Sequence, residues 1–201
     1  MSRRIALLAL CTLGSLVGPG LSPGAENVPD TATRINALIH DDDVAQLLAY
    51  IRAENINLNA PYWQGITLLS QAANEDRPQI AEALLANGAD VNASDDPNGK
   101  VWGPSTALAH TGFSDSRAVA ELLLAKGAKV DGLPGSRATP LDIAAQRGSE
   151  RVALLLLEHG ANPDAVDIAG WTPLHTTAYY NKPAITRILL EHGANIESVG
   201  V

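Results

Sequence analysis

Cysteine is nearly absent from this chain: Cys11 is the only one, and methionine and phenylalanine also occur once each. Beyond Cys11 there is no thiol for a disulfide or a thiolate metal site, so stability must come from packing. Basic residues are also scarce, with 14 Lys and Arg against 22 Asp and Glu, a net charge of −8. Nucleic acids and anionic membranes bind basic patches, so the acidic balance argues against both and favours a neutral or basic partner.

The first 25 residues have the order of a secretory signal peptide. Arg3 and Arg4 precede an apolar run over residues 5–17, and a Gly/Pro-rich stretch leads to Ala25. The run is shorter than the roughly 20 residues that span a bilayer. We therefore expect cleavage near Ala25 and an exported protein, periplasmic or extracellular, whose residues 26–201 carry 12 basic and 22 acidic side chains. An uncleaved anchor, lipidation at Cys11 and twin-arginine export remain alternatives.

A short apolar segment ending in Gly-Ala occurs four times. Its glycines are spaced 39, 33 and 33 residues apart, and a threonine stands 21 residues before each of them. These markers are Thr67 with Gly88, Thr106 with Gly127, Thr139 with Gly160, and Thr172 with Gly193. A constant internal offset with one longer gap indicates a repeating unit that carries one insertion.

The markers predict a pair of helices in each unit. Threonine followed by proline, as at Thr139-Pro140, is typical of a helix N-cap and first turn. Glycine ends a helix well because the left-handed cap conformation costs it little. Between the two markers, apolar residues recur at helical spacing. Each unit is therefore expected to fold as helix, turn, helix and loop, and stacking would align two leucine series, which are Leu69, Leu108, Leu141, Leu174 and Leu84, Leu123, Leu156, Leu189.

The unit that contains Thr172-Pro173-Leu174-His175 and later Leu189-Leu190-Glu191-His192-Gly193-Ala194 resembles the ankyrin repeat. In the preceding unit Asp142 replaces the histidine. The copies at Thr67-Leu68-Leu69-Ser70 and Thr106-Ala107-Leu108-Ala109 lack both the proline and the histidine. The resemblance implies an all-α solenoid of stacked helix-turn-helix units with projecting loops or short hairpins. We expect a signal peptide at 1–25, a linker at 26–30 and repeats over 31–201, with units at 31–60 (degenerate), 61–93, 94–132, 133–165 and 166–201.

The same resemblance implies where a ligand binds, namely at the loop tips and at the exposed end of each first helix. Six of the eight aromatic residues fall at these positions. Large exposed rings are typical anchors of protein interfaces. The predicted partner-binding residues are Trp63, Gln64, Trp102, Phe113, Trp171, Tyr179 and Tyr180. The alternative is that individual rings pack along neighbouring loops.

The longer gap places about six extra residues within 94–104, a segment that contains Asn98-Gly99 and Trp102. Asn-Gly favours a hairpin turn, so a projecting loop is expected. A tolerated surface insertion without a role is the alternative.

No set of residues assembles a catalyst, and we predict no catalytic residue, metal or cofactor. His159 and His192 recur in last helical turns, where imidazole meets free carbonyls, and His175 matches a family histidine that bonds between adjacent loops. The run Asp41-Asp42-Asp43 lacks the spacing of a calcium loop and suggests a solvated turn between helices. Gly112-Phe113-Ser114 lacks the second glycine of a nucleophile elbow.

The sequence therefore favours a non-enzymatic module that binds another protein. Recognition of an envelope glycan by the same aromatic face is the alternative, and an unrecognised enzyme is a distant third. The last helix carries an apolar strip of Ile185, Ile188, Leu189 and Leu190 with five residues after Ile196. We expect this end to fray, to be covered by Val199 and Val201, or to self-associate weakly.

Overall fold

The fold is described by a computed structural model over residues 30–62, 65–95 and 104–198. These ranges contain ten α-helices and no β-strand, which confirms the all-α prediction. The helices are α1 Thr31–His40, α2 Val44–Ala53, α3 Leu68–Asn74, α4 Pro78–Ala86, α5 Ala107–Ser114, α6 Arg117–Ala125, α7 Pro140–Arg147, α8 Glu150–Glu158, α9 Pro173–Tyr179 and α10 Pro183–Glu191. Within the same ranges, no helix has the length and apolar character needed to cross a membrane.

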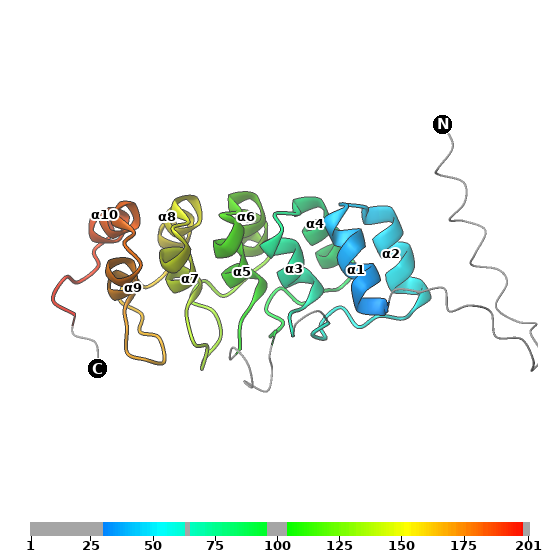
Figure 1. The fold of residues 1–201 in the computed structure, drawn as a ribbon, viewed down its shortest axis with the longest axis horizontal. Helices are drawn as coiled ribbons and strands as arrows, with labels where there is room; N and C mark the ends of the chain where they lie inside the picture. The colour runs from blue at the N-terminus through cyan, green and yellow to red at the C-terminus, as the bar shows by residue number, and fades with distance from the viewer. Residues whose placement is uncertain (1–29, 63–64, 96–103, 199–201) are drawn as a thin grey trace, which may run out of the picture.

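The helices form pairs stacked side by side into an elongated array. In Figure 1, α4, α6, α8 and α10 form one row, and α3, α5, α7 and α9 form a second row beneath it. The loops between pairs extend below the second row. Each helix is only seven to ten residues long. Isolated helices of this length are marginal in water, so packing between neighbouring pairs must stabilise them.

Threonine caps begin the first helix of each of the four later pairs. Thr67, Thr139 and Thr172 each accept a hydrogen bond from the backbone N–H three residues on, whereas Thr106 occupies the cap position without this bond. The four marker glycines that follow the second helices have φ between +84° and +95°, in the left-handed region. The threonine and the glycine thus mark the two ends of each helix pair, because the first caps a helix N-terminus and the second adopts the left-handed conformation after a helix C-terminus.

The core is a continuous apolar layer between the two helix rows. Seven of the eight predicted leucines are buried, and Leu174 is half-buried against the same core. Alanines such as Ala72, Ala144 and Ala145 are fully covered where neighbouring first helices approach. The small side chains permit close helix packing, while leucines fill the space toward the second helices.

Backbone hydrogen bonds close the loops that project from the first helices. The Tyr62 N–H donates to the Ile66 carbonyl at 2.8 Å, and the Asp167 N–H donates to the Trp171 carbonyl at 2.9 Å. The insertion is closed at its base in the same way, by the Asp95 N–H on the Ser105 carbonyl at 3.0 Å. The expected Asn98-Gly99 turn lies outside the described residues, as do residues 1–29, which contain the expected signal peptide.

A ladder of side-chain bonds connects successive loops. One Asn or Asp per repeat accepts a hydrogen bond from the backbone N–H of the equivalent loop in the next repeat, at 2.8–3.0 Å. The pairs are Asn59 with Asp90, Asn92 with Lys129, Asp131 with Asn162, and Asp164 with Asn195. The ladder fixes the spacing of the loops independently of the apolar core.

Candidate binding face

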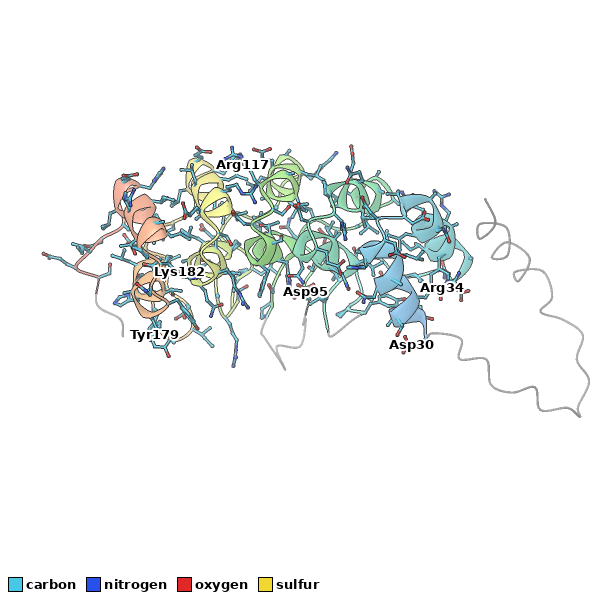
Figure 2. All side chains as sticks on the ribbon, turned by 45° about the horizontal axis from the view of Figure 1, so that its top comes forward. Asp30, Arg34, Asp95, Arg117, Tyr179 and Lys182 are labelled. Carbon is cyan, nitrogen blue, oxygen red and sulfur yellow. The ribbon has the colours of Figure 1, made fainter. Side chains whose placement is uncertain are left out.

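Four of the seven predicted partner-binding residues lie in the described parts of the chain, and three of them are well exposed. The exposed fraction is 70% for Tyr179, 42% for Tyr180 and 41% for Phe113, while Trp171 is half-buried. Figure 2 places Tyr179 along the lower edge, the side of the first helices and loops, with Arg117 along the opposite edge. Trp63, Gln64 and Trp102 lie outside the described residues.

Three of these rings form a cluster at the end of α9. The Tyr179 ring lies edge-on to Trp171 at a centroid distance of 5.2 Å and edge-on to Tyr180 at 5.0 Å. Both distances are within the favourable range for aromatic pairs. The Tyr180 hydroxyl accepts a hydrogen bond of 2.7 Å from the Gln146 side chain of α7, which ties the cluster to the preceding repeat. The structure therefore presents an ordered apolar surface rather than isolated rings.

Phe113 belongs to a different group. Its ring stacks on His110 at 5.4 Å, and the Arg147 guanidinium of the next repeat lies 4.4 Å from the ring centroid. Arg147 is consequently engaged in a cation–π contact, and the Phe113 ring contacts both an imidazole and a guanidinium. The predicted aromatic face is thus divided into a Phe113 group and a Trp171–Tyr179–Tyr180 cluster.

His110, which stacks on Phe113, also makes a contact that the sequence did not predict. His110 Nε2 is 2.8 Å from Asp95 Oδ2. The other carboxylate oxygen of Asp95 accepts the Thr67 N–H at 2.7 Å, and Asp95 is only 3% exposed. One aspartate at the base of the insertion thereby joins two neighbouring repeats. A sequence signal was available, because Asp95 and Asp167 each stand three residues after a ladder residue, Asn92 and Asp164.

A groove of about 240 Å³ opens between α7 and α9, beside the Trp171–Tyr179–Tyr180 cluster. Its lining includes Asp142, Asp167, Trp171, Thr176 and Tyr180. Asp142 is 4% exposed, and its Oδ2 accepts bonds of 2.9 Å from both the N–H and the hydroxyl of Thr139. Its Oδ1 is buried without a hydrogen-bond partner. Burial raises the pKa of the Asp142 carboxyl to about 6, against the opposing effect of the Thr139 bonds.

A family model described as ankyrin repeats, in three copies, matches residues 69–167 and 113–199. The two matches together cover well over half of the chain. The chain belongs to the ankyrin-repeat family. No curated protein matches it significantly over its length. Ankyrin repeats generally mediate protein–protein interactions and are typically not enzymes, which suggests a protein partner for this chain.

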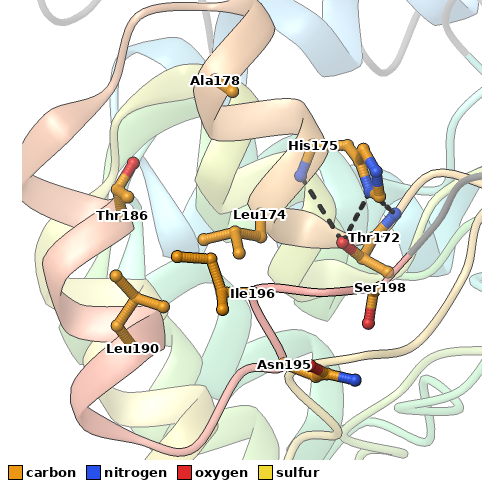
Figure 3. Close-up of a pocket in the computed structure, with 9 residues that line it drawn as sticks. All are labelled: Thr172, Leu174, His175, Ala178, Thr186, Leu190, Asn195, Ile196 and Ser198. Carbon is orange, nitrogen blue, oxygen red and sulfur yellow. Dashed lines mark hydrogen bonds between the residues drawn. The ribbon is translucent and has the colours of Figure 1, made fainter.

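Three histidines of this ankyrin chain form hydrogen bonds at helix ends. His159 Nδ1 lies 2.9 Å from the Leu155 carbonyl, and His192 Nδ1 lies 2.8 Å from the Ile188 carbonyl, as the last-turn interpretation predicted. His175 differs from its family-based prediction, because its Nδ1 accepts from the Thr172 N–H of its own repeat at 3.2 Å. This reciprocal capping box is drawn in Figure 3. Asp142 makes the same box with Thr139, so the two side chains are equivalent as caps.

The three-aspartate run forms the turn between α1 and α2. Asp41 follows α1, Asp42 has a left-handed φ of +56°, and Asp43 caps α2 by accepting the Gln46 N–H at 3.0 Å. The expectation of a turn between helices is therefore confirmed. Across the described ranges, no group of three or more His, Cys, Asp or Glu residues is arranged to hold a metal ion.

The last repeat carries a second groove, of about 280 Å³, on its outer side. Leu174, Leu190 and Ile196 converge on it in Figure 3. In the predicted apolar strip, Ile185 and Leu189 are fully buried and Ile188 is half-buried, so Leu190 is the exposed member. Val199 and Val201 lie outside the described residues.

Proposed function

We propose that this chain is an exported, non-enzymatic ankyrin-repeat adaptor that binds one partner protein through its loop and first-helix face. The observation that carries the proposal is the Trp171–Tyr179–Tyr180 cluster. Its rings pack in T-shaped pairs, and Tyr179 and Tyr180 are exposed. The exposed faces of these rings have no protein contact in the isolated chain, and pre-ordered rings lose little entropy when a partner covers them.

The N-terminal sequence supports the export part of the proposal. A positive start, a 13-residue apolar run and a Gly/Pro-rich segment resemble a cleavable signal. The lack of cysteine after Cys11 is compatible with an oxidising compartment, because no thiol is left to oxidise. A C-terminally tagged full chain expressed in a bacterial host should appear in the periplasm about 25 residues shorter than its coding length. Retention in the cytosol at full length would contradict export.

The binding part is tested by affinity purification of the tagged chain from native envelope extract, comparing wild type with Tyr179→Ala. Tyr179 is 70% exposed, so its truncation should leave stability nearly unchanged. We expect a stoichiometric protein in the wild-type eluate and a loss of more than about 1 kcal/mol of affinity for it in the variant.

Arg187→Ala provides the matched control, because Arg187 is exposed on α10, in the other helix row. It should retain the partner at the wild-type level. Capture that is equal in all three proteins would disprove the proposed face. Binding to isolated cell-wall polymer, without a bound protein and lost in Tyr179→Ala, would instead support the glycan alternative.

A further inference from the structure

One structural position, four residues after the capping threonine, carries a different side chain in each of the four later repeats. These residues are Gln71, His110, Ile143 and Thr176. Gln71 reaches back to Asn36 of the preceding repeat and also donates to Glu75 at 2.8 Å. His110 reaches the carboxylate of Asp95. Because the position faces the boundary between two repeats, its side chain decides what fills that boundary.

The loops before His110 and Thr176 have the same backbone hydrogen bond. The Asp95 N–H donates to the carbonyl of the residue before Thr106, and the Asp167 N–H donates to the carbonyl of the residue before Thr172. The two aspartates therefore occupy matching places in their loops. At the boundary between α3 and α5, the imidazole Nε2 of His110 lies 2.8 Å from the Asp95 carboxylate. At the boundary between α7 and α9, the short Thr176 lines an open groove together with Asp167. The groove therefore lies at the place corresponding to the one that the His110 imidazole occupies between α3 and α5.

The charge in this groove is acidic and incompletely paired. Asp167 uses its Oδ1 to bind the N–H groups of Ala169 and Trp171, at 2.7 and 2.8 Å. Asp142 brings a second carboxylate, and its Oδ1 lacks a partner although the residue is 96% covered. A buried oxygen of this kind is costly unless a donor reaches it.

Three basic or titratable side chains on the adjacent elements are engaged elsewhere, and Arg137, beside Ala138, is exposed. Arg147 lies over the Phe113 ring, and Lys182 packs its side chain against Gly148. His175 of α9 is held by Thr172. The walls are completed by Trp171 and Tyr180, whose aromatic surfaces favour an organic cation over a hydrated metal ion.

We propose that the groove between α7 and α9 is a binding site for a basic side chain, arginine or lysine, of the partner protein. The cation takes the place that corresponds to His110 two boundaries earlier, with Asp142 and Asp167 as its counter-charges and Trp171 and Tyr180 beside its apolar stem. The inference rests on the proposed function, since the cation belongs to the protein that the adjacent aromatic cluster contacts. The acidic net charge of −8 is complementary to such a partner.

A small-molecule titration tests the groove without the partner. N-acetyl-arginine amide is added to the ¹⁵N-labelled chain, expressed from residue 26 onward, at low ionic strength, and amide shifts are followed by NMR. We expect saturable shifts that concentrate at residues 138–146 and 167–180. The neutral isostere N-acetyl-citrulline amide should bind roughly tenfold more weakly or without saturation, because it lacks the charge that the carboxylates pair with.

Two variants localise the site. Asp142→Asn removes one counter-charge while keeping an oxygen for the Thr139 bonds, and should weaken the arginine probe roughly tenfold. Thr176→His recreates the His110 arrangement, so its imidazole should fill the groove and abolish saturable binding. Circular dichroism confirms folding of both variants.

Absence of saturable shifts in the wild type, equal binding of citrulline, or undiminished binding to Thr176→His would each overturn the proposal. None of these results affects the capture experiment with Tyr179→Ala. Failure of the groove is therefore distinguishable from failure of the proposed function.

Discussion

Replacing Asp142 with asparagine should remove one part of the pH dependence of folding stability. The Asp142 carboxyl is buried, its Oδ1 is unpaired, and burial raises its pKa to about 6 from an ordinary value of 3.8. Asparagine retains an oxygen that accepts the Thr139 N–H, so the helix cap of α7 is preserved. The substitution therefore removes the ionisation while disturbing the local fold little.

The magnitude follows from the difference between the folded and unfolded pKa values. The folded chain holds the proton more tightly, so ionisation of Asp142 favours unfolding. The stabilisation that comes from keeping Asp142 protonated is fully present below about pH 3.8 and is lost as the pH rises through about 6. A difference of roughly 2 pKa units corresponds to about 3 kcal/mol. The neutral asparagine never incurs this loss.

Urea unfolding of wild type and Asp142→Asn, followed by circular dichroism at pH 4.5 and pH 7.5, measures the effect. The stability of the variant relative to wild type should rise by about 1–3 kcal/mol between the two pH values. Asp41→Asn, in the exposed turn between α1 and α2, controls for the loss of one unit of charge. A stability difference between Asp142→Asn and wild type that stays constant with pH would refute the argument that a buried carboxylate opposes folding.

Three further predictions concern the array itself. Leu156→Ala should lower the free energy of unfolding by about 2–5 kcal/mol in urea, because Leu156 is fully buried. Gly112→Ala should destabilise the chain in the same assay, although alanine favours helices, because the new Cβ would lie 3.0 Å from the backbone nitrogen of Ala144; a gain in stability would contradict this packing. Amide hydrogen exchange on a verified monomer should be faster at residues 184–192 than at 151–158, whose helix lies between two described neighbours; equal protection would contradict fraying of the last pair.

The ends of the helices could be predicted from the sequence because each is determined locally. A threonine accepts the N–H three residues later, and a glycine adopts a positive φ one residue after the helix cap, whatever the rest of the chain does. The burial of the leucine series was predictable too, since stacking identical units superposes identical positions. Thr106 shows the limit of this reasoning, because it occupies the cap position without the side-chain bond.

The groove and the Asp95–His110 contact were not predicted, because the groove brings together residues of two repeats and the contact spans the insertion within one repeat. Asp95 and His110 are separated by the insertion, and Asp142 and Asp167 are 25 positions apart. Periodicity aligns equivalent residues, but it does not say which unequal residues meet across a boundary. The exposed aromatic positions were predicted as a single face, whereas the structure divides the described ones between Phe113 and the Trp171–Tyr179–Tyr180 cluster.

The distribution of variation explains how one array acquires specificity. The caps, closing glycines and loop ladder perform the same task in every repeat, so changing them alters the scaffold. The position held by Gln71, His110, Ile143 and Thr176 changes freely because only its two neighbouring repeats respond. With histidine at this position, the imidazole packs against the Asp95 carboxylate. With the shorter threonine, a groove lined by two aspartates is left between the repeats. Because that groove adjoins the Trp171–Tyr179–Tyr180 cluster, a partner seated on the rings would place a basic side chain within reach of both aspartates.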